Sequence, residues 1–158
     1  MIPAVGEPAP DGRALVCDGE QFRVRSISDV IGANGLVLIF YGFSFSAIAE
    51  NWWKHYERRN WHELEDTPVL GVSRDGPYAQ NAFIRELNSP FRLFSDVSAE
   101  LIEAYDLLVE RKGMGQTKTA KRAIFVLGAD LTVRERWIAD TWTEPVPVDS
   151  LESSLEFE

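Results

Sequence analysis

The segment FYGFSFSAIA, residues 40–49, decides how we interpret this chain, because it joins a predicted strand to a predicted helix. Residues 36–41 form a continuous apolar run rich in branched and aromatic side chains, which indicates a strand buried on both faces and central in its sheet. Large apolar side chains then recur at steps of four from Ile48 to Tyr56, which predicts a helix over residues 46–64. The serine that begins this helix is a favourable N-cap. A sharp strand-to-helix turn is therefore expected here.

The rest of the chain predicts further alternating elements. We expect strands at 14–17 and 21–25 joined by an Asp-Gly turn, followed by a helical turn at 28–31. After the central strand and helix, we expect a strand at 68–73, a helix at 77–87, a strand at 91–94 and a helix at 98–108 capped by Ser98. A mobile loop at 111–120, strands at 122–127 and 131–138, and a short C-terminal helix capped by Asp149 complete the prediction. Strands that alternate with helices and end in a hairpin predict an α/β fold with a central mixed sheet flanked by helices.

Length and cysteine content limit the possible classes of protein. The chain has 158 residues and is 45% hydrophobic, so we expect residues 1–158 to form one domain with a self-supporting core. Cys17 is the single cysteine, which excludes an intramolecular disulfide and a multi-cysteine metal site. It also favours a reducing compartment, so a cytoplasmic location is expected. The sequence shows neither a signal peptide nor an apolar run of the roughly 18 residues that a membrane span needs.

The formal net charge is −9 and the sequence pI is about 4.8. An anionic surface repels phosphate backbones and acidic lipids, so nucleic acid and membrane are not expected as partners. Lysine occurs at only four positions. Acid excess with scarce lysine also suits a salt-rich cytosol, where ions screen the repulsion between like charges, and a halophilic origin is one interpretation of this composition.

Residues 40–49 resemble the active-site loop of the peroxiredoxin family, also called the alkyl hydroperoxide reductase and thiol-specific antioxidant family. That loop has proline, three residues, threonine, two residues and cysteine. Aligned without a gap, these positions fall on Gly42, Ser46 and Ala49. The resemblance extends in register over residues 5–137, through further short blocks at 5–11, 70–75, 93–96, 104–105 and 122–127. It implies a thioredoxin-like fold with the N-terminal β-hairpin extension of peroxiredoxins.

The resemblance also implies which chemistry the site has lost. In the family, a cysteine thiolate at a helix N-terminus attacks a peroxide oxygen, a threonine hydroxyl and an arginine hold the substrate, and proline shields the pocket. By position, Ser46 retains the hydroxyl and Arg122 the cation, so both are candidates to bind a ligand. Gly42 does not reproduce the shield, and Ala49 has no heteroatom. An alanine cannot form a sulfenic acid, which predicts that peroxidase activity is absent at this pocket.

Two functional hypotheses follow. In the first, the protein is a non-peroxidatic binding module or partner subunit in a redox or stress context, which forms a homodimer, contacts a protein partner or holds a small anion or peroxide-like ligand beside Ser46 and Arg122. In the second, it is an active thiol peroxidase, either because Ala49 replaces a natural cysteine or because Cys17 is the reactive thiol. Asp18 and Glu20 beside Cys17 oppose ionisation of that thiol, which favours a structural cysteine.

Other candidate sites have a simpler structural explanation. His55 and His62 can share one helix face among acidic residues, yet no ligand pattern is present, so we expect surface histidines and neither a metal nor another cofactor. The aromatic residues of the same region favour core or dimer interface over a ligand platform; they are Trp52, Trp53, Tyr56 and Trp61. Arg122 can equally be an ion-pair partner, and the loop at 111–120 a lid or partner contact.

Overall fold

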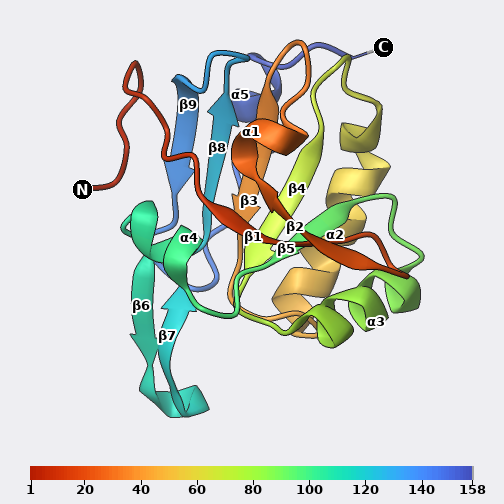
Figure 1. Ribbon diagram of the computed structural model, residues 1–158, viewed down its shortest axis with the longest axis vertical. Helices are drawn as coiled ribbons and strands as arrows, with labels where there is room; N and C mark the ends of the chain where they lie inside the picture. Colours follow the sequence, from red (N-terminus) through yellow and green to blue (C-terminus); the bar gives the residue numbers. More distant parts are fainter. Residues whose placement is uncertain (158) are drawn as a thin grey trace.

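A computed structural model describes residues 1–157 and places a mixed sheet between two layers of helices (Figure 1). The elements in chain order are β1 Arg13–Cys17, β2 Phe22–Ser26, α1 Ile27–Val30, β3 Leu36–Phe40, α2 Ala47–Arg58, the 3-10 turn η1 Trp61–Glu63, β4 Val69–Ser73, α3 Pro77–Leu87, β5 Arg92–Ser95, α4 Glu100–Ala104, β6 Leu108–Arg111, the 3-10 turn η2 Lys112–Met114, β7 Gln116–Ala120, β8 Ala123–Leu127, β9 Val133–Ile138 and α5 Val148–Glu152.

Within residues 1–157, seven strands form the main sheet in the order β2-β1-β5-β4-β3-β8-β9. The central strands β3, β4 and β5 run parallel, while β8 and β9 form an antiparallel hairpin beside β3. The β1–β2 hairpin adds to the other edge through β5. This arrangement confirms the predicted mixed α/β fold and its N-terminal hairpin. It also brings the end of β3 next to the start of β8, where Phe40 pairs with Ala123.

The strand β3 alternates its side chains between two separate cores, as the uninterrupted apolar run predicted. One core contains Leu38 and Phe40 and is covered by α1 and α4. The other contains Val37 and Ile39 and is covered by α2, α3 and α5. Gly71 of β4 lies under this second layer, and a Cβ there would meet the ring of Trp53 at 2.4 Å. The sheet therefore has a glycine where Trp53 of α2 packs against it.

The helix predicted over residues 46–64 is shorter than expected. α2 ends at Arg58, and Asn60 follows with a left-handed φ of 62°. Asparagine tolerates this conformation, which ends the helix and redirects the chain into η1. Trp61 then stacks on Tyr56 with their ring centroids 4.7 Å apart. The apolar spacing continued past the end of the helix because both segments bury aromatic side chains in the same core.

The helix predicted over residues 98–108 is also shorter, and Ser98 is not its cap. α4 begins after Ala99, which has a φ of 65° and makes no side-chain capping bond. The carboxylate of Asp96 accepts the backbone N–H groups of Leu101 and Ile102 at 3.2 and 2.8 Å, and Ser98 Oγ accepts only that of Glu100, at 3.3 Å. The buried carboxylate that follows β5 therefore satisfies two of the free N–H groups in the first turn of the helix.

The mobile loop predicted at residues 111–120 is instead part of a β-hairpin. Leu108 pairs with Ala120 and Val109 with Thr119, so β6 and β7 form a two-stranded ribbon that projects from the body of the molecule (Figure 1). Most side chains between residues 110 and 118 are exposed, so the ribbon lacks the apolar alternation by which strands are usually recognised. Arg74 ties the ribbon to the body by donating to the carbonyl oxygen of Lys118 at 2.7 Å.

The C-terminal helix α5 forms, but Asp149 does not cap it. Pro147 occupies the N-cap position, and the carboxylate of Asp149 accepts from Arg59 at 2.6 Å. Glu152 also contacts Arg59, which joins α5 to the end of α2. In the described part of the chain, no helix has the length and apolar character needed to cross a bilayer.

Candidate functional site

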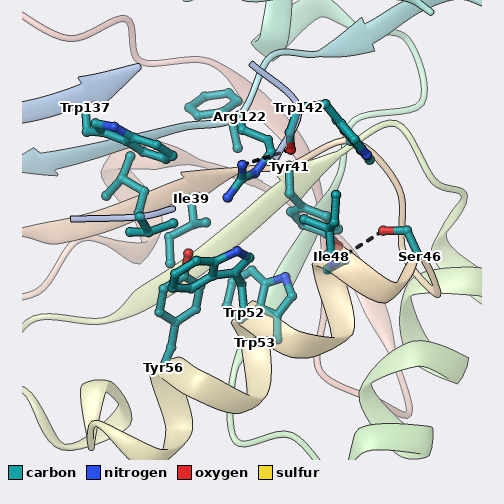
Figure 2. Close-up of a pocket in the computed structure, with 15 residues that line it drawn as sticks. Ile39, Tyr41, Ser46, Ile48, Trp52, Trp53, Tyr56, Arg122, Trp137 and Trp142 are labelled. Carbon is teal, nitrogen blue, oxygen red and sulfur yellow. Dashed lines mark hydrogen bonds between the residues drawn. The ribbon is translucent and has the colours of Figure 1, made fainter. Parts of the chain in front are cut away.

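The four positions aligned with the peroxiredoxin motif lie around one pocket. Gly42 follows β3, Ser46 and Ala49 belong to the start of α2, and Arg122 precedes β8. Figure 2 shows the guanidinium of Arg122 between the rings of Trp137 and Trp142, above the aromatic residues of α2. The space available to a water-sized group is about 20 Å³, which is room for about one water molecule. The pocket exists, but bulky aromatic side chains fill most of it.

Ser46 caps α2, as predicted, and this role occupies its hydroxyl group. The oxygen accepts the backbone N–H of Ala49 at 3.2 Å, and the hydroxyl donates to the carbonyl oxygen of Phe43 at 2.8 Å. A serine hydroxyl has a single proton to donate. Ser46 therefore has no donor left for a ligand, which weakens its candidacy as a binding residue.

Ala49 lies in the first turn of α2 and its side chain is only 4% exposed. Its backbone N–H is already bonded to Ser46, so neither its side chain nor its amide offers a polar group to the pocket. The helix terminus favours negative charge at this place, but the methyl group carries none.

Gly42 allows Trp142 to fill the pocket mouth. A Cβ at Gly42 would lie 2.4 Å from both Cη2 and Cζ3 of the Trp142 ring, which is far inside van der Waals contact. The ring also packs edge-on against Phe43, with centroids 6.0 Å apart, and Arg111 covers its face at 4.1 Å. Trp142 thus shields the pocket at the position where the family motif has proline.

Arg122 is nearly buried, with 5% exposure, and holds the loop that carries Trp142. Its Nη1 donates to the carbonyl oxygens of Trp142 and Glu144 at 3.0 and 2.7 Å. Burial lowers the pKa of Arg122, while nearby Tyr56 and Glu144 act in the opposite direction. Among residues 1–157, Nε and Nη2 of Arg122 make no hydrogen bond, and no carboxylate forms an ion pair with it. The guanidinium therefore combines a structural role with free donors.

The aromatic residues of α2 and η1 belong mainly to the core. Trp53, Tyr56 and Trp61 are buried in the second core, whereas Trp52 is only partly buried and stacks on Tyr56. Burial raises the pKa of Tyr56, so its phenol stays neutral beside Arg122. Trp52, Trp53 and Tyr56, but not Trp61, also line the pocket (Figure 2). Packing and pocket lining are two roles of the same residues.

Cys17 lies far from this pocket. Its side chain is fully buried on β1, with Sγ 3.8 Å from the carbonyl oxygen of Pro77. Strands β5 and β4 lie between β1 and β3, so the strand that carries Cys17 and the strand that leads to the pocket are about 14 Å apart across the sheet. Burial and then the charge of Asp18 raise the pKa of Cys17 to about 12. The thiol is therefore protonated and enclosed.

The histidines do not converge on a site. His55 packs against Trp52 with ring centroids 5.4 Å apart, and His62 is exposed beside Glu63. In the residues that the structure describes, no group of three or more histidine, cysteine, aspartate or glutamate side chains is placed to hold a metal ion.

Comparison with known protein families identifies the family to which this chain belongs. A family model for the AhpC/TSA family matches residues 5–136, which include the whole strand-to-helix segment and Arg122. The chain belongs to the AhpC/TSA family. Its fold is therefore the thioredoxin-like fold in its peroxiredoxin form, and the predicted resemblance is confirmed.

Curated relatives of this AhpC/TSA member are peroxiredoxins. The chloroplastic 2-Cys peroxiredoxins BAS1 of Spinacia oleracea and Arabidopsis thaliana are each 26% identical over 147 residues, covering 87% of this chain and 53% of the relative. A putative peroxiredoxin bcp of Coxiella burnetii is 29% identical over 80 residues, covering 49% of this chain and 53% of the relative. The chain thus spans about half the length of the curated relatives that it matches.

Solved structures agree on the fold. A cysteine-to-serine mutant of PrxQ from Xylella fastidiosa superposes with a TM-score of 0.77 at 23% identity, covering 97% of this chain and 94% of the other. A putative thioredoxin reductase from Burkholderia cenocepacia reaches a TM-score of 0.81 at 17% identity, covering 98% and 99%. At these low identities, the likeness shows the fold alone.

Sequence reasoning missed Trp142 of this AhpC/TSA pocket, and it missed Arg111, which covers the Trp142 ring without lining the pocket itself. Trp142 comes from the segment after β9, and Arg111 from the ribbon that the sequence predicts as a loop. The signal for Trp142 was indirect: a glycine in place of the motif proline leaves a space that another side chain must fill. Arg111 had no such signal, because its approach to Trp142 depends on how the ribbon docks.

Proposed function

We propose that this protein is a binding member of the AhpC/TSA family, working as a partner subunit or ligand-sensing module in a redox or stress context without thiol peroxidase activity of its own. The observation that carries the proposal is the buried methyl group of Ala49 at the first turn of α2, where the family chemistry requires sulfur. Cys17 does not replace it, because its thiol is enclosed on β1 with a pKa raised to about 12.

Peroxide consumption tests this proposal directly. The purified chain is mixed with hydrogen peroxide or an organic hydroperoxide in the presence of a thiol reductant, beside Cys17→Ala as the matched variant. We expect both proteins to match the buffer rate, because neither holds a reactive thiolate. Catalytic consumption that disappears in Cys17→Ala would overturn the proposal in favour of an active peroxidase. The codon at position 49 of the natural gene is read in parallel, and a cysteine codon there would also overturn it.

Restoring the thiol tests whether the scaffold still suits peroxide chemistry. In Ala49→Cys, the sulfur would lie at the N-terminus of a 12-residue helix and in the pocket that Arg122 lines, both of which stabilise a thiolate. We expect the introduced cysteine to be alkylated faster at neutral pH than a free thiol and to form sulfenic acid with peroxide. An unreactive thiol in this variant would mean that aromatic crowding, and not the missing sulfur alone, has abolished the chemistry.

In this proposal residues 1–158 act as one domain, located in the cytoplasm and assembled as a homodimer. Exposed apolar side chains near α3 support self-association: Tyr78 is 79% exposed and Phe45 is 47% exposed. Light scattering coupled to size exclusion measures the mass over a range of concentrations. We expect a dimer that Tyr78→Ser weakens, whereas a monomer at every concentration would contradict this part of the proposal.

A further inference from the structure

A second cavity, which we call the cationic pocket, lies beside Trp142 and outside the pocket of Ala49. Its volume is about 250 Å³, and it is bounded by the first residues of the ribbon, the approach to β8 and the loop after β9. Three cationic side chains line it, those of Arg111, Lys121 and Arg122, together with Trp142 and the exposed Asp140. This volume is below the range of about 300–1,000 Å³ typical of drug-sized ligands, which suits a smaller molecule.

In the described part of the chain, the cations of this pocket form no ion pair. Among residues 1–157, none of Arg111, Lys121 and Arg122 forms an ion pair with a carboxylate. Arg111 donates from Nη2 to the carbonyl oxygen of Ala120 at 2.8 Å, but its Nε is buried without any hydrogen-bond partner in the same described range. Buried polar groups of native proteins are nearly always paired, so an unpartnered guanidinium nitrogen indicates a missing acceptor.

Neighbouring groups compensate little of the positive charge in the cationic pocket. Burial lowers the pKa of Arg111 and that of Arg122, and the charge of Arg122 lowers the pKa of Arg111 further. Glu144 favours the charged form of Arg122, but its two carboxylate oxygens already accept from Trp137 and from the backbone of Asp140, both at 2.9 Å. Two partly desolvated guanidinium groups close to each other are costly, and a bound anion would relieve both the repulsion and the unmet hydrogen bond.

We propose that the cationic pocket binds a small molecule carrying a carboxylate or phosphate group, held by Arg111, Lys121 and Arg122 beside the ring of Trp142. This inference deepens the binding role proposed above by naming its ligand class, and it rests on that role. Arginine suits the task because its planar donors match the oxygens of a carboxylate or phosphate in pairs. Trp142 connects the two pockets, because it lines both of them.

Titration with inorganic phosphate and with succinate, followed by tryptophan fluorescence and calorimetry at constant ionic strength, tests the inference. We expect saturable binding of at least one of the two in the millimolar range or tighter. The stronger of the two ligands identifies phosphate or carboxylate as the preferred group, and either result supports the proposal. Binding of neither anion, or a signal that rises linearly without saturation, overturns it.

Variants distinguish binding of the anion at a specific site from its non-specific attraction to cationic side chains. Arg111→Gln and Lys121→Gln should each weaken binding by about tenfold or more, because each removes a charged donor. Within residues 1–157, the side chain of Lys121 makes no hydrogen bond, so its variant tests the site even if Arg111→Gln fails to fold. Arg92→Gln is the matched control, since Arg92 is exposed on β5, three strands away from β8. Equal weakening in Arg92→Gln and Lys121→Gln would overturn the inference.

The outcomes also distinguish this inference from the proposed function. If the chain is inert toward peroxide and binds neither anion, the proposed ligand class is refuted but the non-peroxidatic role is not. A chain that consumes peroxide catalytically refutes the non-peroxidatic role, whatever the anion titration gives.

Discussion

At the scale of single residues, Gly42 and Trp142 form a coupled pair. In Gly42→Ala, the added Cβ would lie 2.4 Å from two atoms of the Trp142 ring, so the ring must move away from Arg111 and Phe43. We expect the free energy of unfolding to fall by about 1–3 kcal/mol, as in other overpacked sites. Chemical denaturation measures the loss, and tryptophan fluorescence reports the displaced ring.

The double variant Gly42→Ala with Trp142→Ala provides the internal control for this pair. Without the ring, the extra methyl group finds space, so the two losses should not add. Gly113→Ala is a further control, because nothing lies within 4 Å of the Cβ position at Gly113 in the described part of the chain. Additive losses in the double variant would show that Gly42 is required for another reason.

Cys17 gives a prediction of pH dependence at the same scale. Its pKa rises from 9.0 in a model thiol to about 12 in the folded chain, so the native state holds its proton where the unfolded chain has released it. The native state then binds more protons, and the stability that Cys17 contributes is present below pH 9 and lost as pH rises toward 12. We expect the wild type to lose unfolding free energy relative to Cys17→Ala as pH rises from about 8 to about 10. A constant difference would contradict the enclosed thiol.

At the scale of elements, the docking of α5 depends on Glu152. This carboxylate accepts from Nε of Arg59 at 3.0 Å and from Nε1 of Trp61 at 2.8 Å, which joins α5 to the end of α2 and to η1. Glu152→Gln should therefore lower the free energy of unfolding by about 1–3 kcal/mol. Arg59 and Trp61 lower the pKa of Glu152, so this stability is present above the usual value of 4.5 and is lost as pH falls.

Asp149 supplies the matched control for Glu152. It contacts the same arginine at 2.6 Å, but its side chain is 91% exposed, so Asp149→Asn should cost no more than about 0.5 kcal/mol. Urea denaturation of the two variants at neutral pH and again at a pH of about 4 measures both effects. Equal losses would mean that burial of Glu152 and its bond to Trp61 add nothing to the docking of α5.

Elements differ in how far the sequence could predict them. β3 and β8 are five-residue strands with every side chain buried, and α3 has proline in its first turn, so local pattern and tertiary structure agree there. The ribbon β6–β7 differs, because its strands pair with each other and most of its side chains face solvent. The end of α2 at Asn60 and the cap of α4 by Asp96 also depend on contacts or backbone strain that no periodicity reveals.

The candidate site shows the same division. The family resemblance predicts that Gly42, Ser46, Ala49 and Arg122 share one site, and these four residues line one pocket. The sequence does not predict Trp142 in this pocket or Arg111 over its ring, because both residues belong to irregular or projecting segments whose position is set by docking. The sequence pattern predicts which side chains of a helix or strand are buried. Which side chain fills the space left by a glycine depends on the whole fold.

At the scale of the whole molecule, charge is distributed unevenly. Residues 110–122 carry five cations and one anion, a net charge of +4, whereas the complete chain carries −9. The ribbon and the approach to β8 are therefore a basic region on an acidic protein. This contrast favours approach of a small anion to the cationic pocket from the ribbon side, while the remaining surface repels it.

The acidic remainder predicts that salt stabilises the fold. Only five acidic side chains in the described part of the chain form an ion pair, so most carboxylates repel one another without local compensation. Screening shortens the Debye length from about 10 Å at 0.1 M salt to about 3 Å at 1 M. We expect potassium chloride over this range to raise the free energy of unfolding by about 1–2 kcal/mol and Tm by about 2–8 °C.

The triple variant Glu20→Gln, Glu65→Gln and Glu86→Gln neutralises three exposed carboxylates that make no side-chain hydrogen bond within residues 1–157, so its dependence on salt should be shallower. A wild type whose Tm does not change with salt, or a variant with the same slope, would show that carboxylate repulsion does not limit the stability of this fold.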